Sequence, residues 1–115
     1  MIENRQVQEI IAQYERHGWN LRRVLLSAPA KDELPRSLFE NAEVISSDLN
    51  ALWFSRISAG GRETWELRRL SGTPLALVEV FEADDDNETR EDARKEMETR
   101  LAELASKFGD KRTGG

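Results

Sequence analysis

Three strand-like runs joined by very short connections constrain the fold of this chain more than any other feature. The runs cover residues 49–57, 62–70 and 74–83 and carry the apolar and aromatic residues that favour β-structure. Turn-forming sequences separate them, Ser-Ala-Gly-Gly at residues 58–61 and Ser-Gly-Thr-Pro at residues 71–74. Connections this short permit only hairpins, so neighbouring runs must pair antiparallel. We therefore predict a three-stranded antiparallel meander.

Apolar residues at helical spacing predict one amphipathic helix before the meander and another after it. In residues 3–17 the stripe consists of Val7, Ile10, Ile11 and Tyr14, and Gly18 follows where a left-handed C-cap is expected. An acidic run at residues 84–88 supplies N-cap candidates for the second helix. The stripe of that helix consists of Ala93, Met97, Leu101, Leu104, Ala105 and Phe108.

The segment between the first helix and the meander predicts one further strand and a crossover. Residues 19–28 are rich in apolar and β-branched types, end before Pro29, and are expected to form a strand. Residues 31–41 show helical spacing with Pro35 inside it, so they predict at most a short helix that begins near this proline. Val44 and Ile45 could add a short extended piece, which the pattern leaves open.

Together these elements predict a two-layer α+β fold with an antiparallel sheet of about four strands, in the order helix, strand, short helix, three-strand meander, helix. A chain of 115 residues can build one hydrophobic core but not two, so we expect a single domain over residues 1–109 and a disordered tail over residues 110–115. Two helices of about 15 and 20 residues can cover one face of such a sheet. We expect both helices on the same face.

Hairpin geometry assigns the side chains of the meander to two faces. A four-residue loop would place Ile57 opposite Arg62, and a two-residue turn would place Leu70 opposite Leu75. The face that we expect the helices to cover then contains Leu52, Phe54, Trp65, Leu67, Ala76, Val78 and Val80. The second face mixes apolar and charged residues, as interaction surfaces do, and its candidate partner-binding residues are Trp53, Ile57, Arg62, Arg68, Leu77 and Phe81.

The residue types present argue against catalysis. The chain contains no cysteine, which excludes disulfides and thiolate ligands, and His17 is its only histidine. His17 ends the first helix, where capping is the expected role. The spacing of the acidic run at residues 84–88 does not match a calcium loop, and Gly60 and Gly61 lack the lysine of a phosphate-binding loop. We therefore expect no enzyme activity, no metal and no cofactor.

The charge balance limits the possible partners. The chain has 17 basic and 22 acidic residues, a formal net charge of -5, which disfavours binding to nucleic acid and to anionic membrane surfaces. No run of residues has the apolar length of a membrane span or of a signal peptide. We therefore expect a cytoplasmic protein that does not contact membranes.

The sequence thus predicts a role in protein contacts, as a homodimer or as a small adaptor or chaperone-like protein that uses the second sheet face. One alternative is binding of single-stranded nucleic acid, in which Arg62 and Arg68 would act beside the rings of Trp53 and Phe81. Another is a small-molecule or enzymatic site in an unrecognised pocket. It also stays open whether the strand at residues 19–28 or the segment at residues 34–45 covers the second face.

Overall fold

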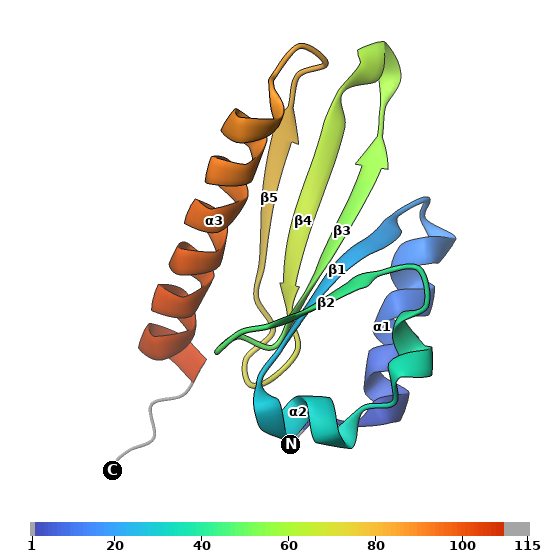
Figure 1. The fold of residues 1–115 in the computed structure, drawn as a ribbon, viewed down its shortest axis with the longest axis vertical. Coiled ribbons are helices and arrows are strands. Elements are labelled where there is room, and N and C mark those ends of the chain that lie inside the picture. Colours follow the sequence, from blue (N-terminus) through green and yellow to red (C-terminus); the bar gives the residue numbers. More distant parts are fainter. Residues whose placement is uncertain (1, 110–115) are drawn as a thin grey trace.

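The computed structural model describes residues 2–109, which form a five-stranded sheet flanked by helices (Figure 1). The helices are α1 (Asn4–Arg16), α2 (Ala28–Glu33) and α3 (Asn87–Leu104), with a 3₁₀ turn at Arg36–Phe39 and a π-helical turn at Ala105–Gly109. The strands are β1 (Asn20–Leu26), β2 (Glu43–Ser46), β3 (Ala51–Ile57), β4 (Glu63–Arg69) and β5 (Ala76–Phe81). The tail expected at residues 110–115 lies outside the described residues.

Local sequence signals set the ends of the two amphipathic helices. Gly18 follows α1 with φ at 87°, a left-handed conformation that glycine adopts without a steric penalty. Asp86 caps α3, because its carboxylate accepts a hydrogen bond from the backbone N–H of Thr89 at 2.8 Å. Both helices lie where the sequence predicts them.

The sheet has the strand order β2-β1-β3-β4-β5. The α+β class and the antiparallel meander of β3, β4 and β5 are confirmed. The prediction of about four antiparallel strands is wrong in one respect, because β2 pairs parallel to β1 and makes the sheet mixed. The connection from β1 to the edge strand β2 runs through α2 and the 3₁₀ turn. A strand of only four residues after such a connection has no hairpin signal in the sequence that would predict it.

The two long helices lie on opposite faces of the sheet, which corrects the two-layer expectation. On one face Val7, Ile10 and Ile11 of α1 pack with Val24, Leu26, Leu52 and Phe54. On the other face Met97 and Leu101 of α3 pack with Leu25, Trp53, Trp65, Leu67 and Phe81. Figure 1 accordingly shows α3 along the β5 side of the sheet and α1 on the side of β1 and β2. We call the sheet face that packs against α1 the α1 face, and the opposite one the α3 face.

Strand β4 is shifted by one residue from the predicted register at both hairpins. Ile57 lies opposite Glu63, not Arg62, because the loop holds five residues and closes with a 2.9 Å hydrogen bond from the Ser58 N–H to the Arg62 carbonyl. Gly60 and Gly61 adopt positive φ inside this loop. At the next hairpin the Arg69 N–H donates to the Leu75 carbonyl at 2.9 Å, which again encloses five residues.

The shift exchanges the faces of every residue in β4. Trp65 and Leu67 pack against α3 and not against α1. Thr64, Glu66 and Arg68 take their place on the α1 face, opposite Val80, Val78 and Ala76 of β5. The two shifts compensate for β5, whose alternation relative to β3 is as predicted.

Candidate interaction surface

The half of the α1 face that lies over β4 and β5 is uncovered. A helix is about 10 Å wide and strands lie about 4.8 Å apart, so one helix covers about two strands. Helix α1 packs over β1 and β3. Val78 and Val80 remain 54% and 48% exposed. We call this surface the open strip, and it consists of Thr64, Glu66, Arg68, Ala76, Val78 and Val80.

A contact between α1 and β4 forms the border of the open strip. The Tyr14 hydroxyl donates a short hydrogen bond to the Glu66 carboxylate. The Tyr14 ring stacks on Phe54, with centroids 3.9 Å apart, and meets Trp19 edge-on at 6.0 Å. Burial, and then the hydrogen bond to the Glu66 carboxylate, raise the pKa of Tyr14 well above its ordinary value. The end of α1 is thereby fixed to the middle of β4.

A hollow of about 350 Å³ opens beside this contact, lined by Gln13, Tyr14, His17, Trp19, Glu66 and Arg68. His17 is exposed and its Nδ1 lies 2.9 Å from the Gln13 carbonyl, as expected for a residue at a helix C-terminus. Arg56 donates to the His17 carbonyl at 2.8 Å and lies over the Trp19 ring at 5.0 Å. The polar groups of His17 and Arg56 are thus engaged in holding the C-terminal end of α1 in place.

Strand β5 forms a free edge of the sheet beside the open strip. Arg69 and Leu75 are a hydrogen-bonded pair, and such pairs alternate along antiparallel strands. Ala76, Val78 and Val80 therefore direct their backbone N–H and C=O groups away from β4. Strand β5 contains no lysine, proline or bulge, features by which monomeric proteins commonly protect an edge, and its one charged residue, Glu79, lies on the α3 face and not in the open strip. The exposed valines and the outward backbone groups thus belong to the same residues.

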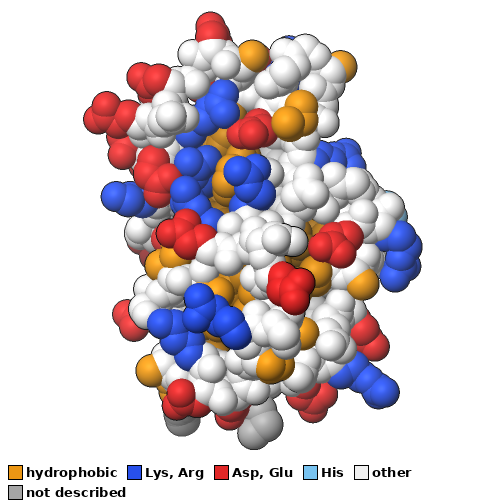
Figure 2. Space-filling view, turned by 45° about the vertical axis from the view of Figure 1, so that its right-hand side comes forward, with side chains coloured by type: hydrophobic (Ala, Val, Ile, Leu, Met, Phe, Trp, Pro, Cys, Tyr) orange, Lys and Arg blue, Asp and Glu red, His pale blue; other side chains and the backbone are white. Residues whose placement is uncertain are grey.

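On the α3 face, arginine side chains cover Trp65. The Arg94 guanidinium lies 4.3 Å from the Trp65 ring centre, and those of Arg22 and Arg23 lie at 5.1 and 5.8 Å. Glu91 accepts hydrogen bonds from Arg23 at 3.0 and 3.3 Å and from Arg94 at 2.9 Å. Figure 2 shows blue side chains gathered around hydrophobic atoms in the upper half of the molecule. The hydrogen bond from Arg23 is the main cause that lowers the pKa of Glu91.

The α3 face also contains two residues that we expected to be exposed. Trp53 is fully buried, and its Nε1–H donates to Glu98 of α3 at 2.9 Å. Phe81 is 3% exposed and lies under Arg90 and Arg94. The expectation of an uncovered second face is therefore wrong at these positions. Helix α3 packs on this face and does not lie beside α1 on the other one. Neither ring offers the stacking surface that binding of single-stranded nucleic acid would use.

The other four predicted partner-binding residues are dispersed. Ile57 is 74% exposed at the end of β3. Arg62 is exposed and pairs with Glu82 at 3.2 Å. Leu77 is half-buried on the α3 face, whereas Arg68 lies in the open strip on the α1 face. Val78 and Val80 are not identified from the sequence because both helices are expected on their face, whereas only α1 lies there and one helix is too narrow to cover the whole sheet.

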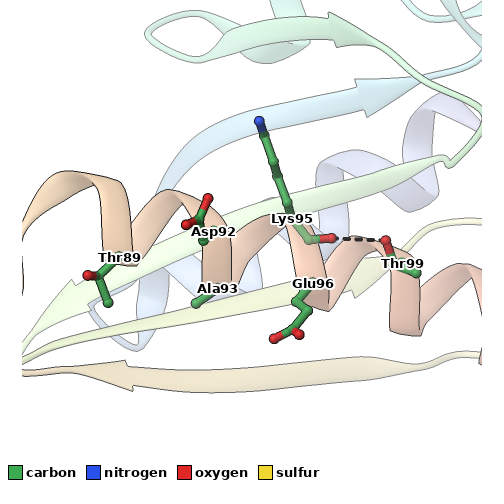
Figure 3. A pocket seen from close by; sticks show the side chains of 6 residues that line it. All are labelled: Thr89, Asp92, Ala93, Lys95, Glu96 and Thr99. Carbon is green, nitrogen blue, oxygen red and sulfur yellow. Dashed lines mark hydrogen bonds between the residues drawn. The ribbon is translucent and has the colours of Figure 1, made fainter.

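The outer side of α3 carries a further shallow depression, lined by Thr89, Asp92, Ala93, Lys95, Glu96 and Thr99 (Figure 3). Figure 3 shows Lys95 and Glu96 pointing in opposite directions. The Thr99 hydroxyl donates to the Lys95 carbonyl at 3.2 Å. All six residues come from one helix and diverge, so the depression brings no set of functional groups together.

Comparisons with known proteins add no functional information, so the open strip is the basis for the functional conclusion. No protein-family model matches the chain, and neither curated proteins nor solved structures give a significant match. Within residues 2–109, no three acidic or histidine side chains are grouped so that they could hold a metal ion. No helix in the same range is both long enough and apolar enough to cross a membrane.

Proposed function

We propose that this chain is a non-catalytic interaction domain that forms a homodimer through the open strip. The observation that carries the proposal is the position of Val78 and Val80, which are exposed next to each other on an edge strand whose backbone groups also point outward. Among the residues with described side chains, only these two and Ile57 are large hydrophobic residues with high exposure. An apolar strip along an unprotected edge favours association.

The size of the strip indicates how much the valines contribute. Full burial of a valine stabilises by roughly 1.5–3 kcal/mol, so covering the exposed half of each contributes about 1 kcal/mol. Two copies supply four valines and therefore about 4 kcal/mol, which only offsets the loss of translational and rotational freedom on association, at least about 4 kcal/mol. A dimer that is stable at micromolar concentrations needs further contacts, and the free backbone groups of β5 are suited to provide them.

Sedimentation velocity over a wide concentration range tests the proposal. We expect the wild-type chain to sediment as a dimer, and Val78→Asp and Val80→Asp to shift it to a monomer with little change in melting temperature. Ile57→Asp is the matched control, because Ile57 is equally apolar and more exposed but lies at the end of β3, outside the strip. A wild-type chain that is monomeric at every concentration, or an Ile57→Asp variant that dissociates equally, overturns the proposal.

A further inference from the structure

We infer that the two copies join by antiparallel pairing of β5 with β5, with Val78 of each copy opposite Val78 of the other. This inference rests on the proposed function and adds the pairing strand and its register. The result is one continuous ten-stranded sheet across a two-fold axis, with the open strips of both copies side by side.

The backbone of β5 restricts the possible registers. Only Ala76, Val78 and Val80 direct their N–H and C=O groups to the free edge, as the 2.9 Å bond between Arg69 and Leu75 requires by alternation. Hydrogen bonds across the new interface therefore form only where these even-numbered residues of one copy lie opposite even-numbered residues of the other. Registers that place an even-numbered residue opposite an odd-numbered one are excluded. Of the rest, only those centred on residues 77, 78 and 79 place at least two of Ala76, Val78 and Val80 opposite one another.

Charge and backbone chemistry distinguish the three candidates. Centring on Glu79 places two carboxylates opposite each other and Ala76 opposite Glu82, which is unfavourable. Centring on Leu77 places Val80 opposite Pro74, which has no N–H to donate. Centring on Val78 pairs Val78 with Val78 and Ala76 with Val80, so every facing pair on the open strip is apolar and every outward N–H has an acceptor.

The α3 face has room for the side chains that this register brings to the edge. Centring on Val78 places the partner's Leu77 beside Glu79. A hollow of about 470 Å³ opens there between Glu79 and α3, and Ala93 and Met97 contribute apolar atoms to its lining. The partner's Leu77 can pack over these atoms, while Glu79 stays near Arg100 on the same rim. Both faces of the joined sheet are therefore compatible with pairing.

The opposite edge of the sheet shows why β5 and not β2 is the joining strand. Strand β2 has only four residues, Glu43–Ser46, and carries an exposed carboxylate at Glu43. Short, charged edges resist strand addition. Strand β5 also carries one exposed glutamate, Glu79, but it has six residues, and the three that form part of the open strip, Ala76, Val78 and Val80, are apolar, so length more than charge distinguishes it from β2.

Single-cysteine variants can read the register directly, since the chain has no cysteine of its own. In the register centred on Val78, the two Val78 Cα atoms form a hydrogen-bonded pair about 5.5 Å apart, within disulfide range, whereas Leu77 and Val80 lie about 7 Å or more from their own symmetry mates, which is beyond it. We expect Val78→Cys to form a disulfide-linked dimer under mild oxidation and Leu77→Cys and Val80→Cys to form little. For the register centred on residue 79, an equal mixture of Val78→Cys and Val80→Cys is used, because replacing Glu79 would itself remove the repulsion.

The outcomes separate the two proposals. Sedimentation as a dimer with cross-linking by Leu77→Cys, or with a mixed Val78–Val80 disulfide in preference to Val78→Cys alone, overturns the register but leaves the homodimer. A dimer in which none of these variants cross-links overturns edge pairing. Hydrogen exchange gives a second measurement: the amides of Ala76, Val78 and Val80 should gain protection as concentration rises, and unchanged exchange in the dimer also overturns edge pairing. A monomer at every concentration overturns the proposed function itself.

Discussion

The guanidinium carbon of Arg94 lies over Trp65, 4.3 Å from the ring centre, and Arg94 is only 8% exposed. This contact explains how α3 covers a sheet face with few apolar residues of its own. Met97 and Leu101 pack under the middle of the helix. Nearer its N-terminus, Arg90 and Arg94 fill the space instead, and they pair with Glu63 and Glu91 at 3.0 and 2.9 Å.

Replacing Arg94 should therefore loosen α3 from the sheet. We expect Arg94→Ala to lower the free energy of unfolding by about 2 kcal/mol, since it removes a buried cation–π contact and a charged hydrogen bond. Urea unfolding followed by circular dichroism measures this change. Arg100→Ala is the matched control, because Arg100 belongs to the same helix but is exposed, and it should change the stability by less than about 0.5 kcal/mol. Equal effects of the two substitutions would show that the Trp65 contact contributes no stability.

The sequence predicts those parts of the fold that depend on local signals. The spacing of Val7, Ile10 and Ile11 predicts α1, and the short loops after Ile57 and Leu70 predict the meander. Helix α3 is predicted correctly although it begins among charged residues, because Asp86 acts as a cap. Each of these features is set by neighbours along the chain.

Features that depend on counting across strands are not predicted correctly. The loop after Ile57 encloses one residue more than expected, and this single residue moves Trp65 from one face to the other. The choice of face for α3 has no local signal, because Leu25 and Leu26 show that both sides of the sheet are apolar. The sequence consequently predicts a covered Val78, and the open strip follows only once the helices are known to lie on different faces.

The arginine cluster over Trp65 should also respond to acid. Glu91 has a lowered pKa because Arg23 and Arg94 bind its charged form, so its contribution to stability is complete above the ordinary pKa of glutamate. That contribution is lost as the pH falls through the lower pKa of the folded state. We expect Glu91→Gln to be less stable than wild type at neutral pH and to lose less stability between about pH 5 and pH 3. Urea midpoints measured across this range test the expectation, and parallel curves for the two proteins would contradict it.

Ionisation of Tyr14 gives a test at alkaline pH. Tyr14 is the only tyrosine in the chain, so its ionisation can be followed by absorbance. Burial, and then the bond to Glu66, raise its pKa above the ordinary value. In the folded protein we expect no tyrosinate absorbance near pH 10, where an exposed tyrosine is half ionised. Glu66→Gln should move the onset to lower pH, because it replaces the charged acceptor with a neutral one while the ring stays stacked on Phe54.

The same titration has a consequence for stability with a definite sign. The folded pKa of Tyr14 exceeds the unfolded one, so its contribution is fully present below about pH 10 and is lost as the pH rises through the folded value. Alkaline unfolding should therefore coincide with the appearance of tyrosinate. Tyr14→Phe keeps the ring and removes the hydroxyl, and it should unfold at alkaline pH with a shallower dependence than wild type. Tyrosinate absorbance that appears near pH 10 while the circular dichroism of the fold is unchanged would show that the hydroxyl is not held by Glu66.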